Sequence, residues 1–125
     1  QAVLEHVNDL DESYIAMHKW LKPGGFMSHE IDFKCHRISA NWDYHWTYSD
    51  FIWKLIVGKR KYFLNRHPYS IHINSLKNSG FKIICDIKNN TESSIKRRNL
   101  AKRFIEMSDD DLITSEVFIQ AIHSN

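Results

Sequence analysis

The chain has 125 residues, of which 42% are hydrophobic, 13% aromatic and 26% charged. This composition excludes disordered and collagen-like proteins, and the length allows one globular domain at most. A formal net charge of +2 does not require a polyanionic partner, because nucleic-acid-binding proteins usually concentrate their basic residues on one face.

The sequence predicts neither a membrane span nor a disulfide framework. No stretch approaches the roughly 18 apolar residues of a spanning helix, and no charged region followed by an apolar run marks a secretion signal. Cys35 and Cys85 are far apart and form no CxxC pair. We therefore expect a cytoplasmic protein without a membrane partner.

The first predicted element is an amphipathic helix over residues 9–21, where apolar side chains recur every three or four positions. Asn8 or Asp9 can cap it. Pro23-Gly24-Gly25 ends it, because proline cannot continue the hydrogen-bond ladder. Residues 26–33 then alternate as a strand. One face carries Phe26, Ser28, Glu30 and Asp32, and the other carries Met27, His29, Ile31 and Phe33.

The stretch from residue 34 to residue 47 has no regular period and is dense in aromatic residues and histidines. Ser49 and Asp50 can cap a short helix that runs to Val57 and ends at Gly58. A loop of this kind can carry a binding function, or it can pack back on the domain as a lid, and both interpretations stay open.

A second helix and strand follow. Ser70 is predicted to cap a helix that ends at Gly80, and residues 81–87 form a β-rich run. A helical segment is expected near residues 100–107 and a last strand at residues 117–123. Strands separated by helices favour an α/β architecture, with a three-stranded sheet flanked by helices.

A sheet of three strands is small for a chain of this length, so another strand should complete it. The strand at residues 26–33 would make a poor edge. We expect a neighbour from outside these residues or from a second copy of the chain, which would give a homo-oligomer through this strand.

Three segments resemble class I S-adenosylmethionine-dependent methyltransferases. Ala2-Val3-Leu4-Glu5-His6-Val7 resembles the segment after the fourth strand of the family's seven-stranded, Rossmann-like sheet. Trp20-Leu21-Lys22-Pro23-Gly24-Gly25-Phe26 resembles the turn into the fifth strand, and Asn78-Ser79-Gly80-Phe81 the turn into the sixth. The resemblance implies that Val117 to His123 is the antiparallel seventh strand, between the other two in a mixed sheet.

Two elements of the family have no counterpart in this chain. They are the glycine-rich turn after the first strand and the acidic residue that ends the second strand, which hold the cofactor. The resemblance therefore implies that residues 1–125 are a single partial domain, the C-terminal half of a methyltransferase domain. Most of the S-adenosylmethionine site would lie outside the chain, and the fragment would be inactive alone.

Four residues near the expected site carry chemistry. The resemblance places Glu5 and His6 beside the methionine part of the cofactor and the acceptor; alternatively, they cap the first helix or face solvent. His29 or Asp32, near the end of the strand, could orient a small-molecule acceptor or act as a base. Because His29 points away from Asp32 and no HExxH motif is present, no metal site is predicted.

The aromatic loop supplies further candidate substrate-binding residues. Aromatic and histidine side chains could stack on a planar or sugar-like acceptor, and an arginine could pair with an acidic group on it. These residues are Trp42, His45, Trp46, Tyr48 and Arg66. In the family, the stretch after the fifth strand often carries acceptor specificity. The alternative is that the aromatic side chains form the hydrophobic core of a lid.

Two other classes of function are considered. Basic runs at residues 59–61 and 96–98, together with the aromatic residues, are compatible with a nucleic-acid-binding module. No RNP pattern or helix-turn-helix spacing supports it, so nucleic acid is not the expected partner. A structural or interaction domain without catalysis is the third interpretation. The preferred one is a methyltransferase portion that serves a small-molecule acceptor, with the methylated atom open.

Overall fold

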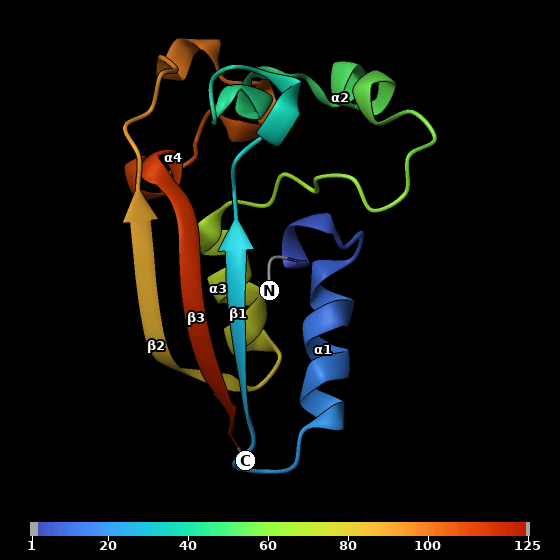
Figure 1. The fold of residues 1–125 in the computed structure, drawn as a ribbon, viewed down its shortest axis with the longest axis vertical. Helices are drawn as coiled ribbons and strands as arrows, with labels where there is room; N and C mark the ends of the chain where they lie inside the picture. The colour runs from blue at the N-terminus through green and yellow to red at the C-terminus, as the bar shows by residue number, and fades with distance from the viewer. Residues whose placement is uncertain (1–2, 125) are drawn as a thin grey trace.

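The computed structural model describes residues 3–124, which form an α/β arrangement of a three-stranded sheet and helices (Figure 1). The elements in chain order are α1 (Leu10–Trp20), β1 (Phe26–Asp32), α2 (Asp50–Val57), α3 (Tyr69–Asn78), β2 (Phe81–Asn90), α4 (Asp109–Ile113) and β3 (Thr114–His123). Ala2, which opens the first resembling segment, lies outside the described residues. No helix among residues 3–124 is long and apolar enough to cross a membrane.

The last strand is the middle strand of the sheet. β3 lies between β1 and β2 and runs antiparallel to both. Phe26 of β1 is opposite Ile122, Ile31 is opposite Val117, and Phe81 of β2 is opposite His123. The prediction of a mixed sheet is wrong, because the described strands form no parallel pair. β1 and β2 point the same way but are separated by β3, so every neighbouring pair is antiparallel.

The main core lies between one face of the sheet and the helices α1 and α3. Leu10 and Tyr14 of α1 and Leu76 of α3 pack in one cluster with Ile31 of β1 and Val117 of β3. Each of these side chains is at most 4% exposed. Burying an aliphatic side chain of this size contributes about 1.5–3 kcal/mol, so this layer fixes the position of β1 and of the residues at its end.

The alternation predicted for β1 is confirmed. Ile31 and Phe33 are buried, whereas Phe26, Ser28 and Glu30 are exposed on the opposite face. The local signals around α1 also act as predicted, because the Asp9 side chain accepts a hydrogen bond from Glu12 N and the helix ends before the turn at Pro23-Gly24-Gly25.

Other predicted elements differ from the structure. Ser70 does not cap α3; it is the second residue of the helix, and its hydroxyl donates to Asp111. β3 begins at Thr114, and β2 extends to Asn90. Residues 100–107 do not form an α-helix but contain the 3₁₀ turn Lys102–Phe104. That turn is held in place by its neighbours, since Ala101 N donates to the carbonyl oxygen of Trp46.

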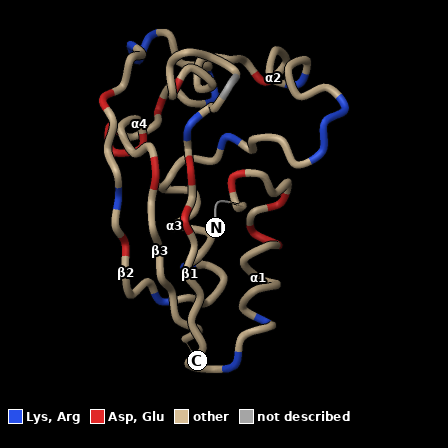
Figure 2. Tube along the Cα trace, viewed as in Figure 1, with Lys and Arg blue, Asp and Glu red and all other residues tan. Residues whose placement is uncertain are grey.

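The charges do not collect into one basic face (Figure 2). The run at residues 59–61 follows α2, whereas the run at residues 96–98 lies beyond the end of β2, on the other side of the molecule. Arg97 is paired with Asp109, its NH2 group 2.6 Å from an Oδ atom. The two runs therefore do not make a continuous surface for a polyanion.

Candidate functional site

The candidate site lies where the end of β1 meets the 3₁₀ turn Leu4–His6 and the start of the aromatic loop. Leu4 is buried in the main core, so it anchors the turn beside the sheet. Asn65 fixes the turn from the other side. Its side-chain amide donates to the carbonyl oxygens of Leu4 (2.8 Å) and Val7 (3.0 Å), and its backbone N–H donates to that of Glu5 (2.8 Å).

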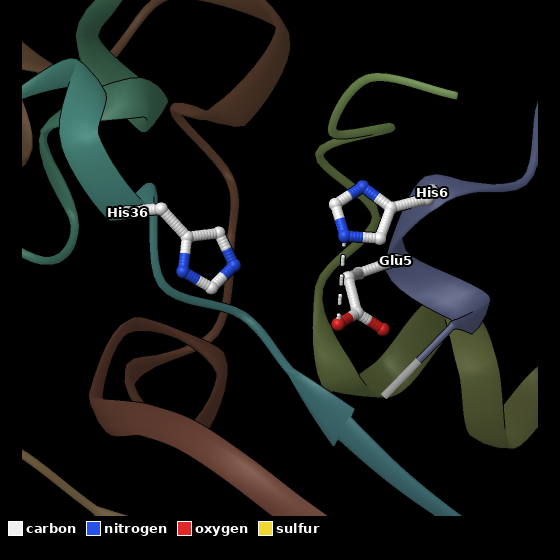
Figure 3. A group of neighbouring side chains, drawn as sticks. All are labelled: Glu5, His6 and His36. Atoms are coloured by element: carbon white, nitrogen blue, oxygen red, sulfur yellow. Dashed lines mark ion pairs between the residues drawn. The ribbon is translucent and has the colours of Figure 1, made fainter. Parts of the chain in front are cut away.

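Glu5, His6 and His36 converge at this position (Figure 3). One carboxylate oxygen and one ring nitrogen from each histidine all lie within 4.8 Å of one another. Glu5 Oε1 is 3.9 Å from His6 Nε2, and the two imidazole rings are stacked with their centres 6.3 Å apart. The residues come from two segments thirty positions apart, which the fold brings together.

Negative charge accumulates around the two imidazoles. Asp32, the last residue of β1, has Oδ2 3.8 Å from His36 Nε2. Glu5 is only 3% exposed, and burial raises the pKa of its carboxyl group. A backbone hydrogen bond and the neighbouring His6 and His36 oppose that shift, while Asp32 adds to it. The site thus combines the buried Glu5 carboxyl group, whose pKa is raised, with the more accessible carboxylate of Asp32.

His36 holds an uncommon backbone conformation. Its φ is 52°, in the left-handed region that few residues other than glycine adopt. It starts the 3₁₀ turn His36–Ile38 that follows β1, and its ring faces His6 across the site (Figure 3). Such strain persists where surrounding contacts impose it, and it often accompanies functional sites.

A cavity of about 660 Å³ opens beside these residues. His6 and His36 line it together with Tyr48, Arg60 and Phe63. Its wall is mostly apolar with a few polar groups, which is the usual character of a small-molecule site. The arrangement can therefore hold a small ligand against two imidazoles and a guanidinium group.

His29 lies apart from this group. It faces a second cavity of about 860 Å³, which is also lined by residues of α1 such as Met17 and Trp20. Burial lowers the pKa of the His29 imidazole. As the alternation of β1 predicts, His29 and Asp32 are on opposite faces, so they do not share one site.

The aromatic loop packs back on the domain. His45 and Trp46 are at most 1% exposed, and Trp46 forms a second core with Phe104 and other apolar residues. Arg66 is 1% exposed, and its guanidinium group donates to the carbonyl oxygens of His45 (3.2 Å) and Tyr48 (2.7 Å). It also pairs with Asp50 at 3.0 Å.

The predicted substrate-binding residues are therefore divided. His45, Trp46 and Arg66 lie in the interior of the loop, where burial denies an acceptor access to them. Trp42 donates through Nε1 to the carbonyl oxygen of Glu92 at 3.1 Å. Tyr48 is the one member of the five that lines the cavity beside His6.

His36 is the site residue that the sequence analysis missed. Its position four residues after Asp32 and just beyond the strand was a usable signal, since residues at the carboxyl ends of strands in α/β sheets commonly face ligands. Its neighbourhood with Glu5 and His6 depends on tertiary packing and has no local sequence period.

Comparisons with known proteins show the fold. No family model matches the sequence, and no curated protein matches it. The structure is similar to the crystal structure of a protein from Listeria monocytogenes that is assigned as an S-adenosylmethionine-dependent methyltransferase, with a TM-score of 0.53 and 14% identity. The match covers 99% of this chain and 59% of that one, so the chain spans little more than half the length of its structural neighbour.

Proposed function

We propose that this chain is the acceptor-side, C-terminal portion of an S-adenosylmethionine-dependent methyltransferase that acts on a small molecule. The observation that carries the proposal is the position of β3, which lies antiparallel between β1 and β2. An amphipathic helix, α1, and the turn at residues 21–25 come directly before β1 in the chain. The fold-level likeness to an assigned methyltransferase agrees with it.

The free edge of β1 gives further support. Among the described strands β1 pairs with β3 alone. The cavity of about 860 Å³ between β1 and α1 is lined by Ser28 and His29 of the strand and by several residues of the helix. A further strand of a larger sheet, which the resemblance expects on this side, would pair with the edge and cover the cavity.

The same edge also suits the rival interpretation, a non-catalytic domain that self-associates through the strand at residues 26–33. Sizing of the protein expressed from its complete coding sequence separates the two. The methyltransferase proposal expects β1 to be paired within one chain. A dimer that breaks when β1 is substituted, without any methyl transfer, favours the rival.

For methyl transfer, the protein mainly has to align the methyl donor with the acceptor. Methyl transfer from a sulfonium is an in-line displacement, and a base is needed only when the acceptor must lose a proton. Asp32 ends β1, and His6 lines the cavity of about 660 Å³; these are the groups we assign to orienting the acceptor. Glu5 and His6 are the assigned contacts to S-adenosylmethionine, most of whose site lies outside these residues.

The test uses protein expressed from the complete coding sequence, S-adenosylmethionine labelled in its methyl group, and the dialysable fraction of a cell extract as the acceptor pool. We expect label to enter a small molecule only when the protein is present. Asp32→Asn should lower the rate about a hundredfold, whereas the matched control Glu92→Gln, an exposed acid away from the site, should not. Label in RNA or protein alone would overturn the small-molecule acceptor, and no transfer at all would overturn the proposal.

A further inference from the structure

The donor atoms of Glu5, His6 and His36 are those of a metal site. Two imidazole nitrogens and one carboxylate oxygen form the ligand set of many mononuclear zinc and iron centres. The three donor atoms lie within 4.8 Å of one another, and Glu5 Oε1 is 3.9 Å from His6 Nε2. We propose that these three residues bind one divalent first-row transition-metal ion.

The spacing suits a single ion after small side-chain movements. Metal–ligand bonds of about 2.0–2.2 Å place neighbouring ligand atoms roughly 3–4 Å apart. The Glu5–His6 distance already falls in this range. The side chain of His36 is 44% exposed and that of His6 is 36% exposed, so an ion can reach both rings from solvent.

The Glu5 carboxyl group is buried beside the His6 ring, and one of its oxygens has no hydrogen-bond partner within residues 3–124. Among the described residues, Glu5 Oε2 and His6 Nδ1 are inaccessible to solvent and have no hydrogen-bond partner. Glu5 is 3% exposed, and an unpaired buried carboxylate is costly. An ion at this position would compensate the charge of Glu5 directly.

The surroundings provide the supporting contacts that such sites need. Asn65 holds the Glu5–His6 turn through three hydrogen bonds. Asp32 Oδ2 lies 3.8 Å from His36 Nε2, the ring nitrogen that faces Glu5 and His6 in Figure 3, so a second carboxylate borders the same position. Lys34, the nearby cation, is itself paired with Glu116 and Asp32.

The ligand types favour a transition metal over magnesium. Imidazole suits zinc, iron and similar ions, whereas Mg²⁺ prefers an octahedral shell of oxygen atoms. Three protein ligands leave at least one position open, and both histidines line the cavity of about 660 Å³. The step from ion binding to function rests on the proposed methyltransferase activity: an open position here would hold an oxygen atom of the acceptor.

Metal binding is tested without cofactor or acceptor, so its outcome is independent of methyl transfer. Chelator-treated protein is titrated with Zn²⁺ by calorimetry and with Co²⁺ by visible absorption. We expect one ion per chain and no comparable binding of Mg²⁺. His36→Asn is the main variant, because asparagine tolerates the positive φ of this position and the ring is exposed, so the fold should be retained.

The matched control is His67→Asn, which removes a half-buried histidine outside the cluster. We expect His36→Asn to weaken Zn²⁺ binding at least tenfold and His67→Asn to leave it unchanged. Glu5→Gln should act like His36→Asn, with circular dichroism reporting whether it folds. Equal Zn²⁺ affinity in the His36 and His67 variants would overturn the site, as would the absence of stoichiometric binding to the unsubstituted protein.

Discussion

The hydroxyl of Tyr14 lies 3.0 Å from Nδ1 of His72 and joins α1 to α3 inside the core. Both residues are fully buried. Burial lowers the pKa of His72 to about 3 and raises that of Tyr14. The imidazole is therefore neutral near pH 7 and shares a hydrogen bond with the tyrosine hydroxyl.

This pair predicts acid sensitivity. The pKa of a histidine in an unfolded chain is about 6.5. Below that pH the unfolded state binds a proton at residue 72, whereas the folded state does not. The stabilising contribution is present above pH 6.5 and is lost as the pH falls toward the folded value. His45, whose pKa burial also lowers to about 3, adds a second contribution. Below about pH 6.5, each of these two histidines lowers the free energy of unfolding by about 1.4 kcal/mol per pH unit.

Urea unfolding between pH 7 and pH 4.5 measures this dependence. His72→Gln should be less stable at pH 7 but should lose less stability per pH unit than the unsubstituted protein. Parallel curves for the two proteins would show that His72 is not protonated on unfolding.

The core between β1 and β3 predicts a large truncation effect. Ile31 is completely buried opposite Val117, whereas Ile84 of β2 is 55% exposed. Ile31→Ala should lower the free energy of unfolding by about 2–5 kcal/mol, since it removes buried methyl groups and leaves a cavity. Ile84→Ala is the matched control, and chemical denaturation should show a much smaller loss. Comparable losses would contradict the packing of β1 on this core.

The loop interior predicts a structural role for Arg66. Arg66→Met leaves the carbonyl oxygens of His45 and Tyr48 without their donor, and each unsatisfied acceptor costs about 1–3 kcal/mol. The guanidinium group also stacks 4.5 Å from the ring centre of Trp53, so tryptophan fluorescence should report a loosened loop. Arg98→Met, at an exposed position, is the control. Unchanged fluorescence and stability in the Arg66 variant would place this residue outside the loop core.

Asn65 is predicted to position Glu5 and His6. Asn65→Ala removes two side-chain hydrogen bonds to the Leu4–Val7 turn. We expect weaker Zn²⁺ binding, about 10–100-fold, as for other residues that support metal ligands. Asn99→Ala, at an exposed position, should bind Zn²⁺ normally. A purely structural role of Asn65 would lower the melting temperature while leaving the affinity of the folded protein unchanged.

Local sequence signals predicted the parts of the fold that local chemistry determines. The apolar period of α1, the cap at Asp9 and the alternation of β1 all depend on neighbouring residues, and the structure has them. The predicted cap at Ser70 is wrong, because the Ser70 hydroxyl donates a hydrogen bond to Asp111, 41 positions away, instead of accepting one from the helix. Residues 100–107 lose their helix because the turns there pack against Trp46.

The candidate site was predictable only in part, for the same reason. Glu5, His6 and Asp32 were found through the resemblance and the strand end. His36 was not found from the sequence. It lies beside Glu5 and His6 because the Leu4–His6 turn packs against the end of β1, which is a tertiary contact. Burial of Trp46 likewise depends on Phe104 and its neighbours, which follow more than fifty positions later in the chain.

Calorimetric titration of S-adenosylmethionine into protein expressed from the complete coding sequence measures whether this sheet belongs to a methyltransferase. We expect saturable binding of one molecule per chain, and weak or no binding to residues 1–125 alone. Absence of saturable binding to the complete protein would contradict the assignment of this sheet to a methyltransferase.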